Sequence, residues 1–195
     1  NIQVKDEVSA PIYRVVEKSN DGVKLSATNI PNIIFTKEIQ LMEDSHQLLV
    51  TNGVFNNTNQ NIYVRNYETI SRDDNSTASI MLPTYTGSAY YDSENKFSKI
   101  SFDDMLENDQ AIQVKDSWIS MIEHYFFSAW LPTDPQTKTV YTNHENGVFT
   151  IGSTSQYDTI QPGQNYKTQS VMFVGPKLQS EISGLADGLD LTVDY

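Results

Sequence analysis

The sequence predicts an all-β fold, mainly antiparallel, in which sheets stack as a sandwich. Apolar and polar residues alternate at a period of two along several segments. Those segments are rich in β-branched and aromatic residues, which favour strands. Turn-forming clusters of Asn, Asp, Gly and Pro separate them at intervals of roughly ten residues, a spacing typical of an antiparallel sandwich.

The first half of the chain contains the clearest alternation. Ile33, Phe35, Ile39 and Leu41 share one face of an expected strand, which only Lys37 interrupts. Further strands are expected at residues 12–16, from 23 to near 31, at 48–54 and at 62–70.

The second half continues the pattern with shorter segments. Strands are expected at residues 96–102, 111–115, 140–141, 148–151 and 166–174, and residues 84–91 carry three tyrosines around Gly87. Residues 102–106 predict one helical turn with an aspartate cap. Gln161-Pro162-Gly163-Gln164 predicts a turn before the last strand, because proline presets φ ahead of a glycine.

The stretch from Ser117 to Pro132 carries the densest aromatic surface and holds both tryptophans. Each aromatic side chain buries about 150–250 Å², so we expect this aromatic ribbon at the centre of the core. The expected core residues are Trp118, Tyr125, Phe126 and Trp130. An exposed aromatic platform for a ligand is the alternative interpretation.

Gly175-Pro176 ends the last expected strand, and proline suits the first position of a helix. Leu178, Ile182, Leu185 and Leu189 follow at spacings of four, three and four, which places them on one helical face. A short amphipathic helix is therefore predicted at about 176–189, interrupted or ended near Gly184 to Gly188. With no internal repeat and no convincing linker, residues 1–195 are predicted to form a single domain.

Charge and composition exclude several classes of partner. The net charge of −12 makes nucleic-acid phosphates and anionic lipid surfaces poor partners by Coulomb repulsion. The chain has no cysteine, so it has no disulfide framework and no thiolate chemistry. The aromatic ribbon is too short and too polar to cross a bilayer, which needs about 20 apolar residues.

A search for catalytic, cofactor and metal sites identifies none. The three histidines, His46, His124 and His144, lack metal-ligand spacing. Ser128 and Ser153 lack a nucleophile-elbow context. The neighbouring carboxylates Asp73-Asp74 and Asp103-Asp104 are expected to solvate loops or cap a helix. The protein is therefore predicted not to be an enzyme.

Three tyrosines around Gly87 form a candidate contact surface. Tyr85, Tyr90 and Tyr91 could present amphipathic rings to a partner, because tyrosine is enriched at interfaces. Cross-strand packing within the domain is the alternative.

Several motifs occur together along the chain. They are the ribbon Trp118-Ile-Ser-Met-Ile-Glu-His-Tyr-Phe-Phe-Ser-Ala-Trp-Leu-Pro132, Gln161-Pro162-Gly163, Val174-Gly175-Pro176-Lys177 and the final Leu189-Asp-Leu-Thr-Val-Asp-Tyr195. Phe35-Thr36-Lys37, the segment around 85–91 and Phe97-Ser-Lys-Ile-Ser-Phe102 accompany them. In combination they resemble the large periplasmic domain of the YidC family of bacterial inner-membrane protein insertases.

The resemblance implies a β-supersandwich related in shape to galactose mutarotase and other sugar-binding folds, followed by a C-terminal helix. It also implies the periplasmic face of a Gram-negative inner membrane, a chain shortened at its N-terminus, and a parent anchored by membrane helices, one of them after Tyr195. The implied role is non-catalytic help in inserting and folding inner-membrane proteins, alone or with the Sec translocon, without a cofactor.

The implied partners are SecD, SecF and, through the parent protein, nascent membrane proteins. The expected C-terminal helix with Leu178, Ile182, Leu185 and Leu189 would couple the domain to the membrane. A carbohydrate-binding or mutarotase-like module is the alternative function. A mutarotase needs an acid and a base that face each other across a cleft, and His124 with Glu123 cannot do this if both lie on one buried strand.

Overall fold

The computed structural model describes residues 1–73 and 84–193. The chain divides into two compact units, one of Asn1–Tyr67 with Ser155–Met172 and one of Glu68–Thr154 with Phe173–Tyr195. We call them unit 1 and unit 2. The expectation of a single domain stays a prediction. Within the described residues, no helix is long and apolar enough to span a bilayer.

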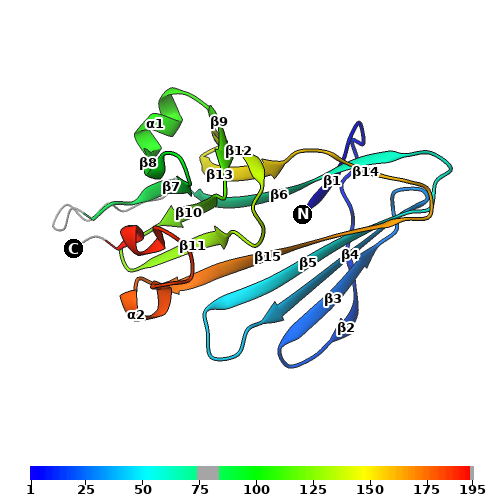
Figure 1. The fold of residues 1–195 in the computed structure, drawn as a ribbon, viewed down its shortest axis with the longest axis horizontal. Helices are drawn as coiled ribbons and strands as arrows, with labels where there is room; N and C mark the ends of the chain where they lie inside the picture. The colour runs from blue at the N-terminus through cyan, green and yellow to red at the C-terminus, as the bar shows by residue number, and fades with distance from the viewer. Residues whose placement is uncertain (74–83, 194–195) are drawn as a thin grey trace. The chain divides into compact units, whose positions relative to one another are not determined.

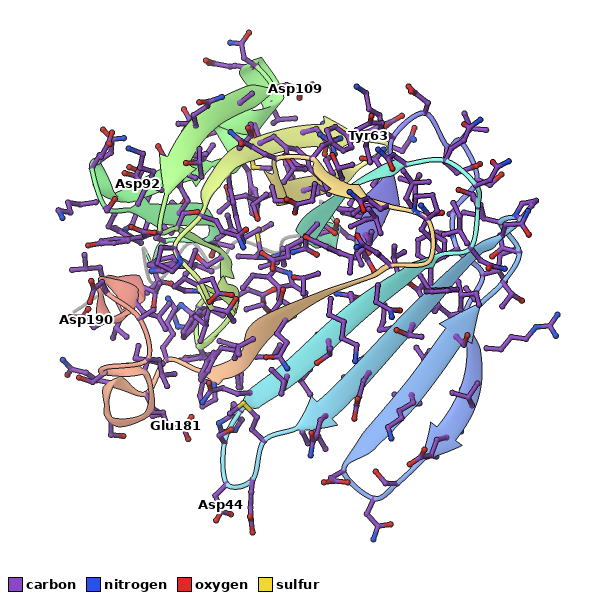
Figure 2. The ribbon with its side chains drawn as sticks, turned by 45° about the vertical axis from the view of Figure 1, so that its right-hand side comes forward. Asp44, Tyr63, Asp92, Asp109, Glu181 and Asp190 are labelled. Carbon is purple, nitrogen blue, oxygen red and sulfur yellow. The ribbon has the colours of Figure 1, made fainter. Side chains whose placement is uncertain are left out.

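Unit 1 contains a ladder of strands in the order β2, β3, β4, β5 and β15. β2 (Arg14–Lys18), β3 (Gly22–Ala27), β4 (Ile33–Leu41) and β5 (Gln47–Asn56) follow each other as antiparallel hairpins, side by side in Figure 1. Asp44 lies at the tip of the β4–β5 hairpin (Figure 2). β15 (Asn165–Pro176) contributes residues to both units. These strands match the predicted ones within a few residues.

A second, smaller group of strands in unit 1 was not predicted in full. β6 (Ile62–Asp73) pairs antiparallel with β1 (Ile2–Val4) and with β14 (Asp158–Ile160). Asp73 therefore ends a strand, whereas its neighbour Asp74 lies outside the described residues. β1 and β14 have three residues each, too few for an alternating pattern to stand out.

The core of unit 1 packs β4 and β5 against β1, β6 and β14. Phe35 and Val54 are direct neighbours across β4 and β5, and they cluster with Val64 of β6. The exposed fraction of each of these three side chains is 2% or less. The alternation predicted for residues 33–41 therefore places Ile33 and Phe35 inward, whereas Leu41 at the end of β4 is 56% exposed.

Lys37 occupies the one polar position on that inward face. Its Nζ donates hydrogen bonds to Oδ1 of Asn1 at 2.7 Å and of Asn52 at 2.6 Å. The same atom lies 5.5 Å from the centroid of the Tyr13 ring. Burial lowers the pKa of Lys37, because desolvation disfavours the charged form. The strand continues through this position because carbonyl oxygens satisfy the ammonium group.

Unit 2 contains two sets of hydrogen-bonded strands. In one set the strands follow in the order β15, β11, β10, β7 and β8, and in the other in the order β6, β13, β12 and β9. The first comprises β7 (Gly87–Asp92), β8 (Lys96–Ser101), β10 (Trp118–Ile122) and β11 (Phe126–Leu131). The second comprises β9 (Gln110–Lys115), β12 (Thr137–Glu145) and β13 (Val148–Ser155). Every pairing with a resolved register is antiparallel, which confirms the predicted strand class.

The aromatic ribbon supplies part of the unit 2 core. Trp118 is 2% exposed, and all five residues of β10 are buried. Phe127 of β11 stacks on Phe173 with ring centroids 4.8 Å apart. Trp130 is half-buried and donates from Nε1 to the carbonyl of Thr69 at 3.1 Å.

Two residues expected in that core are exposed, so the prediction is wrong for them. Tyr125 is 67% exposed and Phe126 is 58% exposed. Tyr125 precedes β11, and Phe126 begins it. Because strand side chains alternate between faces, burial of Phe127 turns Phe126 outward.

The helix α1 (Phe102–Glu107) follows β8 where one helical turn was predicted. Its N-cap is Ser101, and not an aspartate as expected. Asp104 is instead the third helical residue, and its Oδ2 accepts from the Ser101 backbone N–H at 2.9 Å. The Ser101 hydroxyl and then this backbone bond hold the pKa of Asp104 below its usual value.

The predicted short helix near the C-terminus is present, but it covers less of the chain than the expected range of about 176–189. β15 extends to Pro176, α2 covers only Gln179–Ile182, and the 3-10 helix η1 covers Leu189–Thr192. Gly184 with φ +86° and Gly188 with φ +70° separate these two helices. The interruption expected near Gly184 to Gly188 is therefore present, because left-handed glycines end helices.

Candidate functional site

The turn between β10 and β11 presents two bare aromatic rings. The Glu123 N–H donates to the Phe126 carbonyl at 2.9 Å, which closes this hairpin tightly. Tyr125 and Phe126 occupy its far end, where their rings are mostly exposed. Exposed large aromatic residues that lie together mark an interaction surface.

The chain after β15 forms the other side of this surface. The Lys177 N–H donates to the Tyr125 carbonyl at 2.9 Å, so the backbone pairing of β15 continues beyond Pro176. Leu178 follows and is 50% exposed. α2 begins directly afterwards, as Figure 1 shows at the end of β15.

Between these elements lies an open hollow of about 350 Å³, which we call the apolar hollow. Its lining is formed by the turn after β10, the end of β15 and two flanking residues: Thr84, His124, Tyr125, Phe126, Pro176, Lys177, Leu178 and Val193. Such a volume suits one or two apolar side chains of a partner rather than an extended ligand.

The polar groups near the hollow hold its walls in place. A ring nitrogen of His124 forms a hydrogen bond with the Thr84 hydroxyl. The His124 ring also packs edge-on against Tyr125, with centroids 4.0 Å apart. Glu123 turns away to Arg72, whose Nε lies 3.6 Å from its Oε1. These contacts orient Tyr125 and fix the turn.

A second set of contacts fastens the segment 177–193 to the sheet. Trp118 donates from Nε1 to the Asp187 carbonyl at 2.8 Å, and Tyr91 stacks on Trp118 with centroids 5.9 Å apart. Ile182 and Leu189 are fully buried. A Cβ at Gly188 would lie 2.5 Å from the Tyr91 ring, so only glycine fits there.

The four leucine and isoleucine residues expected to couple the domain to the membrane differ in burial. Ile182 and Leu189 are buried anchors, Leu185 is half-buried, and only Leu178 faces the apolar hollow. They lie on one segment but not on one helical face, because the glycines interrupt it. Their part in coupling to a membrane stays a prediction.

Of the three tyrosines expected to form a contact surface, Tyr90 is buried. Tyr90 is 7% exposed and lies opposite Ile119 of β10. Tyr91 lies opposite Trp118, and the Tyr85 hydroxyl donates to the Ser88 carbonyl at 2.6 Å. The cross-strand alternative is therefore right for Tyr90 and Tyr91, whose pattern could not distinguish packing from exposure.

The remaining candidates for chemistry have structural contacts. Ser153 is buried and bonds to Glu68 at 3.3 Å, and His144 packs on Phe149. His124 and Glu123 lie in the turn after β10 and not on one buried strand, and each has the structural contact described above. Among the residues that the structure describes, no three His, Asp or Glu side chains lie close enough to hold a metal ion.

Sequence reasoning missed the apolar hollow. The alternation of Phe127, Ala129 and Leu131 was a usable signal that Phe126 faces outward. The approach of Thr84, Lys177 and Val193 to this turn had no local signal, because it depends on the pairing of distant strands.

Solved structures with this architecture are carbohydrate-active enzymes. A galactose mutarotase related enzyme from Lactobacillus acidophilus gives a TM-score of 0.55 at 8% identity, covering 84% of this chain and 71% of that chain. The GH36 alpha-galactosidase AgaB from Geobacillus stearothermophilus gives 0.58 at 9% identity, covering 89% and 29%. These likenesses confirm the predicted fold and extend to the fold alone. The carbohydrate-binding alternative is not favoured.

Sequence comparison identifies relatives that are named for membrane protein insertion and not for a chemical reaction. Membrane protein insertase YidC of Haemophilus ducreyi is 36% identical over 190 residues, which are 97% of this chain and 35% of that protein. The protein of the same name from Methylobacillus flagellatus is 38% identical over 154 residues, 78% of this chain and 28% of that protein. The chain thus spans about a third of the length of these relatives.

A family model described as the YidC periplasmic domain matches residues 7–195, which is nearly the whole chain. This description implies the periplasmic side of the inner membrane. The motifs that carried the resemblance, from Phe35 to the final Tyr195, lie within the matched range. The chain belongs to the family of YidC periplasmic domains.

Proposed function

We propose that this domain acts without catalysis, as a contact module of an insertase that helps inner-membrane proteins to insert and fold. The parent protein would span the inner membrane several times and work alone or with the Sec translocon. Family membership supports this proposal, as does a candidate site lined mainly by apolar side chains. SecD and SecF are the partners that the resemblance suggests, and nascent membrane proteins would meet the parent.

The observation that carries the proposal is that the apolar hollow is bonded directly to the segment 177–193, which is itself anchored on the sheet. The backbone bond from Lys177 to Tyr125 links the two. The bond from Trp118 to Asp187 and the buried Ile182 and Leu189 fix the rest of the segment. A rigid wall of this kind presents Leu178 and Phe126 with little loss of conformational entropy on binding.

The test uses the full-length insertase that carries this domain, in cells depleted of their own insertase. Phe126→Ser with Leu178→Ser removes the exposed walls of the hollow while the buried anchors remain. We expect insertion of a substrate membrane protein, measured by protease accessibility, to fall by about tenfold, as for a hot-spot contact.

The matched control is Val15→Ser with Val16→Ser, two exposed apolar residues of β2 in unit 1. It should leave insertion unchanged. Unaltered insertion in the Phe126→Ser, Leu178→Ser variant would show that the hollow is not the functional contact. Sugar anomerisation followed by polarimetry should stay at the uncatalysed rate.

A further inference from the structure

Unit 1 carries an exposed cluster of two cations and two tyrosines that the function above does not use. On β1, Ile2 and Val4 are buried, so Gln3 and the following Lys5 face outward. On β6, buried Val64 leaves Tyr63 and Arg65 on the same outward face. Tyr63 is labelled in Figure 2.

The strand register brings these side chains together. Gln3 lies opposite Arg65, and the Lys5 N–H donates to the Tyr63 carbonyl at 2.8 Å. Asp158 of β14 lies opposite Val64, which places Tyr157 beside Arg65. Three neighbouring strands therefore form one outward face, which we call the cation–tyrosine face: Lys5, Tyr63, Arg65 and Tyr157.

The cations lie against the aromatic rings. Lys5 Nζ is 5.7 Å from the Tyr157 centroid and 6.0 Å from that of Tyr63. The Arg65 guanidinium carbon is 5.0 Å from the Tyr157 centroid, and its Nε donates to Gln3 Oε1 at 2.8 Å. Tyr63 and Tyr157 remain 47% and 39% exposed. The rings hold both cations in defined positions.

No carboxylate neutralises this face within residues 1–73 and 84–193, where neither Lys5 nor Arg65 has a carboxylate oxygen within 4.0 Å. Asp6 follows Lys5 directly and is exposed, and no ion pair joins these two described residues. Two other acids close in the sequence are occupied elsewhere. Glu7 accepts a hydrogen bond from the Ser9 N–H, and Asp158 contacts Tyr166. A positive face without an internal counterion is unusual in a chain with 25 acidic and 13 basic residues.

We propose that the cation–tyrosine face binds an extended acidic segment of another protein. Arginine and lysine pair with carboxylates, and the exposed tyrosine hydroxyls can donate to the same groups. Lys5 and Arg65 lie on successive outward rows, which are about 7 Å apart in a sheet. Alternate residues of an extended peptide have the same spacing, so carboxylates at alternate positions fit both rows.

The net charge favours a peptide over a lipid surface as the source of the anions. An anionic bilayer is extended and would also face the remaining acidic surface, which carries the net charge of −12. A single strand of peptide touches only the cation–tyrosine face, so it gains the local attraction without the wider repulsion.

The experiment measures binding of the fluorescent peptide Glu-Thr-Glu-Thr-Glu-Thr-Glu-Thr to the whole chain by anisotropy at two salt concentrations. We expect salt-sensitive binding that falls at least about tenfold in the Lys5→Gln, Arg65→Gln double variant. The matched control, Lys24→Gln, also removes an exposed lysine of unit 1, but one that is paired with Glu17 at 3.3 Å. It should bind as the original chain does.

Two results would overturn the proposal. One is equal peptide affinity of the double variant and the original chain. The other is binding to phosphatidylglycerol vesicles that depends on Lys5 and Arg65 while the peptide does not bind. Both substituted side chains are at least partly exposed, so unchanged thermal melting of the double variant confirms that its fold is intact. Failure here would leave the insertase proposal untouched, because that one is tested at Phe126 and Leu178.

Discussion

The apolar hollow of unit 2 and the cation–tyrosine face of unit 1 expose aromatic rings in opposite ways. At the hollow, Tyr125 and Phe126 lie beside Leu178 and Pro176. On the cation–tyrosine face, Lys5 and Arg65 lie against the rings. The hollow therefore offers hydrophobic contact, and the face offers charge with specific geometry. Exposure of an aromatic residue alone does not say which kind of partner it suits.

The largest expected difference in stability is between substitutions at two adjacent phenylalanines, of which Phe127 is buried and Phe126 lines the hollow. Phe127→Ala should lower the free energy of unfolding by about 3–5 kcal/mol, because it leaves a cavity beside Phe173. Phe126→Ala should lower it by less than about 1 kcal/mol, because the ring is 58% exposed. Urea denaturation of both variants measures the difference. Equal losses would mean that Phe126 belongs to the core after all.

The fastening of the segment 177–193 can be weakened at one glycine. Gly188→Ala should cost about 2–4 kcal/mol, because its Cβ would meet the Tyr91 ring and its φ is +70°. Gly184→Ala is the control, since its φ is +86° but no atom lies within 4 Å of the added Cβ. It should cost only about 1 kcal/mol. Similar losses at both positions would deny the close contact at Tyr91.

A smaller change removes one hydrogen bond. Trp118→Phe keeps an aromatic ring against Tyr91 but cannot donate to the Asp187 carbonyl. We expect a loss of about 1–3 kcal/mol and faster amide hydrogen exchange in residues 182–193. Peptide binding at the cation–tyrosine face, which has no residue in this segment, should not change. Exchange that stays slow would show that Ile182 and Leu189 suffice as anchors.

The smallest expected effect concerns alkaline pH. Burial, aided by the charge of Tyr67 for Tyr13 and of Asp158 for Tyr166, raises the pKa of each of these tyrosines to about 12. An unfolded tyrosine titrates near 10, so the unfolded state loses its protons first and stability falls between about pH 10 and 12.

The Tyr13→Phe, Tyr166→Phe double variant should show a shallower decline in urea midpoint over that range. Lys37 acts in the opposite direction, because its pKa is lowered and its ammonium form opposes folding until high pH. An identical pH profile for the variant and the original chain would contradict this assignment.

The strands could be predicted from the sequence because alternation and turn residues act locally. β4 matched its expected range of 33–41, and Lys37 did not break it, because Asn52 lies opposite and accepts a hydrogen bond from its ammonium group. The extent of the helix expected at 176–189 was harder to predict, because leucine spacing does not show that β15 continues to Pro176 or that both Gly184 and Gly188 interrupt the helix. β1 and β14 are too short to carry a pattern of their own.

The functional surfaces were less accessible to sequence reasoning. Tyr125 and Phe126 were predicted to be core residues, because the sequence shows that they are aromatic but not towards which face of the sheet their side chains point. The cation–tyrosine face joins residues from Lys5 to Tyr157, and only the register of three strands brings them together. The family resemblance, in contrast, could be found from the sequence, because its motifs are continuous stretches that can be read without knowing which distant strands pair.

The two adjacent phenylalanines of β11 have a consequence for how that strand finds its place. If β11 slid by one residue, Phe126 would take the position of Phe127 and hydrophobicity would scarcely distinguish the two alignments. The choice then falls to the next pair, because Ala129, with no exposed surface, lies opposite fully buried Ser120. In the misaligned pairing Ser128 would take this buried position and Trp130 would take the buried position of Leu131, so these two positions favour the observed alignment.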